Sequence, residues 1–281
     1  MVDTFKPQSL QEAVDVLSDK GAILFAGGTD LMVQRRRRGG LIPDFDRPVI
    51  LIGHLKELKE ISNSTREIRI GSCCTYTALL SHKAVPEILK TCVSQIASPG
   101  IRNRGTIGGN ICNASPAGDT LPVLYALDAS VILARDNKER VLPIEKFIKG
   151  PGTTVLEADE LLTRIIIPHS SFNKFFYKKV GTRAYNALSK ISFTGLALKK
   201  LRAVEDVRIA FGAVSPTVVR SKDIEAQIRG KDIDAIQKMI PEILSHYSKL
   251  IDPISDQRSN RRYRKTVSLN LLNSFLKNYM L

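Results

Sequence analysis

The chain has 281 residues, of which 43% are apolar and 25% charged, the composition of a soluble globular protein. No apolar run approaches the roughly 18 residues that a bilayer-spanning helix needs, and the first residues lack the basic and apolar stretches of a secretory signal, so we expect a cytoplasmic protein. The net charge of +14 suggests a nucleic-acid partner, but the basic residues are dispersed and no aromatic platform lies among them, which disfavours that interpretation.

The first predicted unit spans residues 1–55. Ser9 is placed to cap a helix whose apolar side chains recur on one face. A buried strand then turns through a glycine pair into a short helix, and another buried strand follows. The predicted elements are a helix at 10–18, a strand at 22–26, a helix at 29–38 and a strand at 48–52. Their order gives a small β-α-β unit.

The second predicted unit spans residues 56–170. It opens with a hairpin, because two alternating stretches flank a polar turn. The predicted elements are the hairpin strands at 58–62 and 67–71, helices at 75–82 and 86–96, a long loop at 100–119, a helix at 120–127, a strand at 129–134 with a hairpin turn at 136–138, and a strand at 160–167. These elements suffice for a larger α/β unit.

The third predicted unit spans residues 171–281. Three successive strands predict an antiparallel sheet, with the last two strands joined near residues 203–206. Helices follow and back this sheet. The predicted elements are strands at 175–180, 189–198 and 207–214 and helices at 221–229, 233–249 and 261–279.

Two stretches with adjacent glycines carry the functional signal. One covers residues 106–119 and the other covers residues 25–31. Glycine lets a ligand approach the main chain closely, so successive N–H groups can converge on an anion such as a pyrophosphate. In the earlier stretch Thr29 or Asp30 can also cap a helix N-terminus, where phosphates bind.

Neither stretch matches the dinucleotide fingerprint G-x-G-x-x-G or the phosphate loop G-x-x-x-x-G-K-[ST]. A single glycine pair between a strand and a helix is more often a plain tight turn. Two such stretches about eighty residues apart, each with a threonine and an amide or acid beside the glycines, predict one extended ligand that is gripped from two sides.

The remaining residues predict neither a metal centre nor a catalytic group. The four cysteines show no C-x-x-C spacing and do not cluster with the four histidines. Cys73 and Cys74 are adjacent among small residues, which favours two buried thiols over a redox pair. No H-E-x-x-H or G-x-S-x-G motif is present. We therefore expect no metal, and a cofactor that carries the chemistry itself.

In this order and at this separation, the two glycine stretches resemble the FAD-binding signatures of the flavoprotein (medium) subunits of molybdenum hydroxylases. The likeness is to the subunits of carbon monoxide, xanthine and nicotinate dehydrogenases, and it runs along the whole chain. Further similar segments are Phe5-Lys6-Pro7, Arg69-Ile70-Gly71, residues 210–217 with Arg220, and Tyr263-Arg264-Lys265.

The resemblance implies an α+β protein in which a two-part, vanillyl-alcohol-oxidase-like (type-2) FAD-binding α/β region precedes an antiparallel-sheet-plus-helices domain. FAD would lie between the first two units, and the third would close over the flavin. The residues implied to bind FAD are Leu24, Phe25, Ala26, Gly27, Gly28, Thr29, Asp30, Leu31, Ile96, Thr106, Ile107, Gly108, Gly109, Asn110, Asp119, Leu162 and Lys179. Lys178 would serve in place of Lys179 if the alignment slipped by one residue.

The resemblance also implies that this chain is one link of an electron relay. Electrons would arrive from a [2Fe-2S] small subunit that works with a molybdopterin large subunit, be paired at FAD, and leave to an external acceptor such as NAD. A self-contained type-2 flavin oxidase is the first alternative, disfavoured because the leading glycine loop lacks a histidine or cysteine for a covalent flavin link. A basic, non-catalytic binding protein is the second.

The run of four arginines at residues 35–38 is the sharpest basic feature of the sequence. Such runs are usually solvated helix faces. The alternative is a face that docks an acidic partner subunit.

Overall fold

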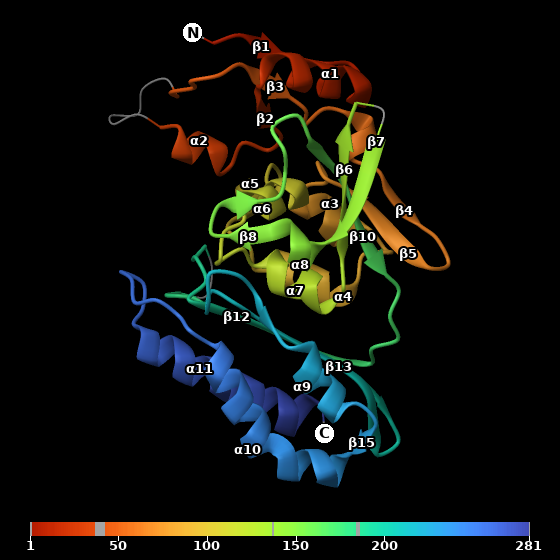
Figure 1. The fold of residues 1–281 in the computed structure, drawn as a ribbon, viewed down its shortest axis with the longest axis vertical. Helices are drawn as coiled ribbons and strands as arrows, with labels where there is room; N and C mark the ends of the chain where they lie inside the picture. The colour runs from red at the N-terminus through yellow and green to blue at the C-terminus, as the bar shows by residue number, and fades with distance from the viewer. Residues whose placement is uncertain (1, 37–42, 137, 184–185, 281) are drawn as a thin grey trace.

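The computed structural model describes residues 2–36, 43–136, 138–183 and 186–280. These ranges form an N-terminal unit, a central unit and a C-terminal sheet backed by helices, which lie one below the other in Figure 1. The predicted α+β architecture with an antiparallel C-terminal sheet is confirmed. None of the helices in these ranges has the length and hydropathy that spanning a bilayer requires.

Three short parallel strands form the N-terminal sheet, in the order β1-β3-β2. The predicted cap is confirmed, because the Ser9 hydroxyl accepts the Glu12 N–H at 3.2 Å. The elements are β1 (Thr4–Phe5), α1 (Leu10–Lys20), β2 (Ile23–Phe25), α2 (Leu31–Gln34) and β3 (Val49–Leu51). The α2 helix is shorter than predicted, since it buries no side chain that would extend it by packing. Residues 37 and 38 of that prediction lie outside the described residues.

An antiparallel sheet in the order β4-β5-β10-β6-β7 forms the central unit. Its helices and strands share one apolar core. The elements are the 3-10 helix η1 (Lys56–Leu58), β4 (Ile61–Asn63), β5 (Glu67–Gly71), α3 (Tyr76–Ser81), α4 (Glu87–Ser94), α5 (Pro99–Arg102), α6 (Ile107–Asn113), α7 (Thr120–Ala126), β6 (Ser130–Arg135), β7 (Lys138–Pro143), α8 (Ile144–Phe147), β8 (Ile148–Gly150), β9 (Thr153–Thr154) and β10 (Leu161–Pro168). The predicted hairpin is confirmed, although its first strand begins later because η1 precedes it.

The prediction of a continuous loop over residues 100–119 is wrong, because α5 and α6 lie there. The Thr106 hydroxyl caps α6 by accepting the Gly109 N–H at 3.1 Å. The glycine pair therefore occupies the first turn of a helix. Gly108 packs so closely that an added Cβ would lie 2.6 Å from the Ser72 Cβ. This contact with a residue distant in sequence makes the glycine necessary, and local sequence gave no sign of it.

The C-terminal unit is an antiparallel sheet in the order β11-β12-β13-β14, with β15 beside β13. The predicted strands and helices are confirmed with two differences. The strands β12 and β13 join at residues 201–202, before the predicted position, and the helix predicted at 261–279 ends as an α-helix at Ser274 and continues as a π-helix. The elements are β11 (Lys174–Val180), β12 (Ile191–Lys200), β13 (Ala203–Gly212), β14 (Val219–Arg220), α9 (Lys222–Ile228), β15 (Lys231–Asp232), α10 (Ile233–Leu250), α11 (Arg261–Ser274) and the π-helix η2 (Phe275–Met280).

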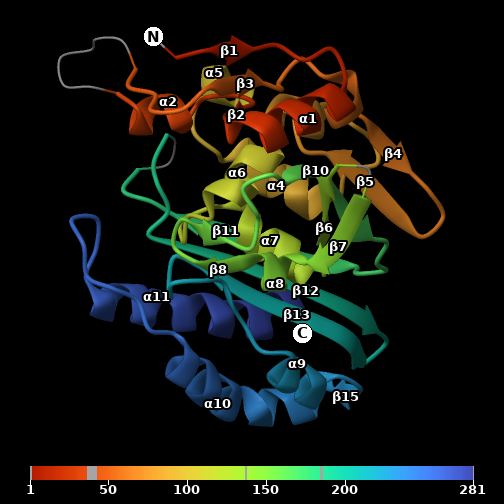
Figure 2. The same ribbon diagram turned by 45° about the horizontal axis from the view of Figure 1, so that its top comes forward.

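Both faces of the C-terminal sheet are covered, as Figure 2 shows with α7 above it and α10 and α11 below. Phe193 and Phe211 join the core that contains α10 and α11. Leu196 and Ala210, from the same two strands, join the core of the central unit. Because successive side chains point to opposite faces of a strand, one sheet closes its own core and also holds the C-terminal unit against the central unit.

A buried ion pair stabilises the contact between the central unit and the C-terminal unit. The Arg220 side chain on β14 is 4% exposed and lies 2.9 Å from the Glu225 carboxylate, which is 1% exposed. Arg220 also pairs with Asp128 of the central unit at 2.6 Å and donates to the Tyr125 carbonyl. Removing one member of such a cluster leaves the other charge buried without a partner.

We therefore expect Arg220→Met to lower the free energy of unfolding by about 3–5 kcal/mol, because Glu225 would stay buried and unpaired. Lys200→Met is the matched control, since Lys200 pairs with Glu205 at the surface, where such pairs contribute about 0–1 kcal/mol. Denaturant unfolding of both variants measures the difference. Equal denaturation midpoints for the two variants would show that the Arg220 cluster does not stabilise the contact between the central and C-terminal units.

Candidate functional site

A cleft of about 500 Å³ lies where the N-terminal unit, the central unit and β11 meet. It contains residues of the β2–α2 connection, α6 and the start of α7, and we call it the glycine cleft. Most of the predicted binding residues line it. They are Leu24, Ala26, Gly27, Gly28, Thr29, Asp30, Leu31, Ile96, Thr106, Gly109, Asn110, Asp119 and Lys179.

Four predicted residues lie behind this lining. An ideal Cβ on Gly28 would meet the Phe25 ring at 2.3 Å, so Phe25 packs directly against the loop. Ile107 and Gly108 are buried on the inner side of α6. Leu162 is buried on β10 in the core of the central unit. Their direct contact with a ligand stays a prediction.

The cleft also contains residues that sequence reasoning missed. Asn113, Ser115 and Gly118 belong to the second glycine stretch, so its length could have suggested them. Tyr76 and Gln34 lie on helices without any local signal, and only the fold brings them to the cleft. The other missed residues are Ala97, Ile101, Cys112, Ala117, Asn186, Ala187 and Leu188.

The connection between β2 and α2 offers free backbone donors to the cleft. The N–H groups of residues 28–31 donate to no group in the described part of the chain. Gly28 has a φ of +73°, which favours glycine and bends the chain so that it can enter α2. Unpaired N–H groups in succession are suited to an anionic ligand.

The glycine pair of the second stretch contributes in a different way, because the main-chain donors of Gly108 and Gly109 are already used. The Gly108 N–H donates to the Ser72 carbonyl at 2.8 Å, and the Gly109 N–H donates to the Thr106 hydroxyl at 3.1 Å. The Asn110 side-chain oxygen accepts from the Thr120 hydroxyl, so its NH₂ group remains for the cleft. This stretch therefore offers side-chain donors and a close backbone wall.

A buried ion pair closes the cleft on the side of the C-terminal unit. The Lys179 ammonium lies 2.7 Å from Oδ2 of Asp119, and the two side chains are 8% and 9% exposed. Lys179 also donates to the Gln95 carbonyl at 3.2 Å, and the Ser189 hydroxyl donates to Oδ1 of Asp119. Both carboxylate oxygens of Asp119 are thus occupied by protein groups.

The choice between Lys178 and Lys179 follows from the geometry of β11. Side chains alternate between the two faces of a strand. Lys179 points inward and lines the cleft, whereas Lys178 is exposed on the other face. Lys179 is therefore the residue that can reach a ligand there.

The free cysteines are thiols at neutral pH. Cys73 and Cys74 are buried, as predicted, and burial raises the pKa of each to about 11. Cys112 lines the cleft, and burial raises its pKa to about 12. Since the thiolate is the reactive form, these groups are poor nucleophiles. Among the described residues, no three His, Cys, Asp or Glu side chains gather to hold a metal ion.

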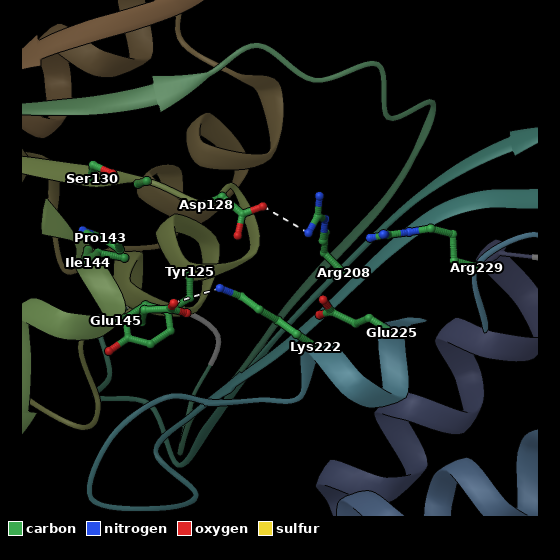
Figure 3. Close-up of a pocket in the computed structure, with 11 residues that line it drawn as sticks. Tyr125, Asp128, Ser130, Pro143, Ile144, Glu145, Arg208, Lys222, Glu225 and Arg229 are labelled. Carbon is green, nitrogen blue, oxygen red and sulfur yellow. Dashed lines mark hydrogen bonds and ion pairs between the residues drawn. The ribbon is translucent and has the colours of Figure 1, made fainter. Parts of the chain in front are cut away.

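A second cavity of about 480 Å³ lies between the central and C-terminal units (Figure 3). Asp128 and Arg208 pair across it at 3.0 Å, and Glu145 and Lys222 pair at 2.8 Å. Arg229, on its wall, pairs with Asp206 at 2.8 Å. Because these charges are matched within the protein, we assign this cavity to the joint between the units.

The run of arginines at residues 35–38, for which a docking face is the alternative prediction, lies only partly in the described residues. Arg35 pairs with Asp46 at 2.9 Å. Arg37 and Arg38 lie outside the described residues.

Two families match the chain in sequence. Residues 1–170 match the family described as FAD binding domain in molybdopterin dehydrogenase, and residues 176–279 match the CO dehydrogenase flavoprotein C-terminal domain. The glyceraldehyde dehydrogenase medium chain of Sulfolobus acidocaldarius is 34% identical over 268 residues, which cover 93% of this chain and 92% of that protein. The nicotinate dehydrogenase FAD-subunit of Eubacterium barkeri is 36% identical over 208 residues, which cover 69% and 68%.

The fold also matches a solved structure. Carbon monoxide dehydrogenase from Hydrogenophaga pseudoflava has a chain that superposes with a TM-score of 0.87 and 26% identity, covering 96% of this chain and 94% of that one. The architecture and the family matches define a two-part FAD-binding flavoprotein with an antiparallel C-terminal domain. The chain belongs to the FAD-carrying medium subunits of the molybdenum hydroxylases, and it is therefore an oxidoreductase subunit whose cofactor is FAD.

The glycine cleft fits this cofactor. Its volume of about 500 Å³ lies within the usual range of ligand sites, about 300–1,000 Å³. The N–H groups of residues 28–31, which donate to no group that the structure describes, are suited to an anionic diphosphate. Gly27 keeps the walls together, because an added Cβ would lie 2.0 Å from the Arg104 carbonyl oxygen.

We expect Gly27→Ala to lower the free energy of unfolding by about 1–3 kcal/mol, as overpacking usually does, and to weaken FAD binding by separating the two walls. Gly150→Ala is the matched control, because no atom lies within 4 Å of the added Cβ. Denaturant unfolding and FAD fluorescence titration measure the two effects. If Gly27→Ala keeps the stability and FAD affinity of the wild type, the close approach of the walls is not required.

Proposed function

We propose that the glycine cleft holds FAD noncovalently. The N–H groups of residues 28–31 would bind the diphosphate, and Thr106, Asn110 and Lys179 would supply further donors. One observation carries this assignment: residues 28–31, whose N–H groups donate to no described group, and Lys179 line the same cleft. Asp119 would act chiefly by orienting Lys179, since its carboxylate is already satisfied by Lys179 and Ser189.

When bound there, FAD would supply the ability to accept and release electrons singly or in pairs. The chain's own residues position the cofactor and limit its contact with water. Ile96 and Leu24 would provide apolar contacts beside the polar donors. Lys179 would place a positive charge in a site of low exposure, where electrostatic interactions are stronger than in water.

We further propose that the chain passes electrons from a [2Fe-2S] small subunit through FAD to an external acceptor such as NAD. A molybdopterin large subunit would oxidise the substrate and feed the small subunit. Two observations support this assembly. The similar proteins are named as a medium chain and an FAD-subunit of dehydrogenases, and the glycine cleft offers donors for a redox cofactor.

Lys179→Met should raise the dissociation constant of FAD about 10- to 100-fold, because hydrogen bonds from charged donors contribute about 1.5–3 kcal/mol. Lys178→Met is the matched control, since Lys178 is the exposed neighbour on the same strand. Titration of each apoprotein with FAD gives both constants. If both variants lose FAD affinity equally, the change in net charge is the cause. If Lys179→Met keeps the wild-type affinity, the proposed location of FAD beside Lys179 is wrong.

The relay predicts a specific behaviour of the isolated subunit. It should accept electrons from dithionite into its bound FAD, but it should not oxidise purines, aldehydes or N-heterocycles. Activity should appear after addition of the iron–sulfur and molybdenum subunits. Substrate oxidation by the isolated chain would contradict the relay and favour a self-contained flavin enzyme.

A further inference from the structure

Ser189 is a buried residue to which neither the sequence nor the resemblance assigns a role. Its side chain is 1% exposed and its hydroxyl donates to Oδ1 of Asp119. Asp119 belongs to the central unit, whereas Ser189 and Lys179 belong to the C-terminal unit. One carboxylate is therefore held from two points of the neighbouring unit, at the wall of the glycine cleft.

The direction of the Lys179 ammonium depends on this carboxylate. An ammonium group has three N–H donors. One is directed to Oδ2 of Asp119 at 2.7 Å and one to the Gln95 carbonyl at 3.2 Å. Because Lys179 lines the glycine cleft, its third N–H is the one available to a ligand there.

Ser189 determines how the carboxylate is shared. Without its O–H, Oδ1 of Asp119 becomes a buried acceptor with no partner, which is an unfavourable state. The carboxylate can then turn both oxygens toward Lys179, and this draws an N–H away from the cleft. The Tyr177 hydroxyl is buried beside Asp119 and Cys92 and forms no hydrogen bond of standard geometry with any described residue, so it is the donor that can replace the Ser189 hydroxyl.

We propose that Ser189 is a positioning residue that, through Asp119, keeps an N–H of Lys179 directed toward FAD and so raises the reduction potential of the bound cofactor. The physical reason is that a directed positive charge favours the reduced cofactor, which carries the added negative charge. This inference rests on the proposed location of FAD in the glycine cleft.

The test measures the two-electron midpoint potential of bound FAD together with its dissociation constant. Ser189→Ala should weaken the binding of reduced FAD about tenfold relative to the binding of oxidised FAD. For a two-electron couple this is a fall in midpoint potential of about 30 mV. Ser189→Thr keeps the hydroxyl and should restore the wild-type potential. The double variant Ser189→Ala/Tyr177→Phe should also show the low potential, because it removes the Tyr177 hydroxyl that can donate to Asp119 in place of Ser189.

Ser192→Ala is the matched control. Ser192 lies opposite Lys179 in the register of β11 and β12, and its hydroxyl is equally buried but has no hydrogen-bond partner among the described residues. It should leave the potential at the wild-type value. An equal fall in Ser192→Ala and Ser189→Ala would overturn the positioning role and assign the effect to packing.

The outcomes separate this inference from the proposed function. If Lys179→Met weakens FAD binding but Ser189→Ala keeps the wild-type potential, the cleft assignment stands and the role of Ser189 is overturned. If Lys179→Met leaves FAD binding unchanged, both the cleft assignment and the role of Ser189 are overturned. If Ser189→Ala does not fold, the nearly isosteric Ser189→Cys gives the same test, with a smaller fall expected because a thiol is a weak donor.

Discussion

The ion pair between Asp119 and Lys179 joins the central unit to the C-terminal sheet, beside the apolar core that the two share. Asp119 stands at the start of α7 in the central unit, and Lys179 lies on β11 of the C-terminal sheet. A pair buried this far is costly unless its remaining donors and acceptors are satisfied. Here Ser189 donates to the second carboxylate oxygen and the Gln95 carbonyl accepts a second N–H of Lys179, and the pair forms one wall of the glycine cleft. The position of that wall therefore depends on how α7 sits on the C-terminal sheet.

The other walls are set by close backbone packing. Gly27 approaches the Arg104 carbonyl and Gly108 approaches Ser72, each at a distance that leaves no room for a side chain. The glycines thus hold the N-terminal unit and α6 in place, while residues 28–31 provide N–H groups that donate to no described group. Both glycine stretches thus provide close packing, and the first also contributes main-chain N–H groups while the second contributes side-chain donors.

The sequence predicts features that depend on neighbours in the chain. Ser9 as a helix cap and the strands of the C-terminal sheet follow from spacing and alternation, and the structure confirms them. Helix α6 was missed because the glycines favour a loop locally, whereas the Thr106 cap and the hydrogen bond from the Gly108 N–H to the Ser72 carbonyl stabilise the helix. Tyr76 reaches the cleft only through the fold. Lys179 was named through family resemblance, since no spacing rule connects it to Asp119, which lies sixty residues away.

A crystal structure of the subunit with bound FAD tests the central claim most directly. The account predicts that the diphosphate oxygens accept hydrogen bonds from N–H groups of residues 28–31, with an N–H of Lys179 directed at the cofactor. FAD bound in the second cavity beside Arg208 and Lys222, or in the glycine cleft with its diphosphate away from residues 28–31, would contradict it.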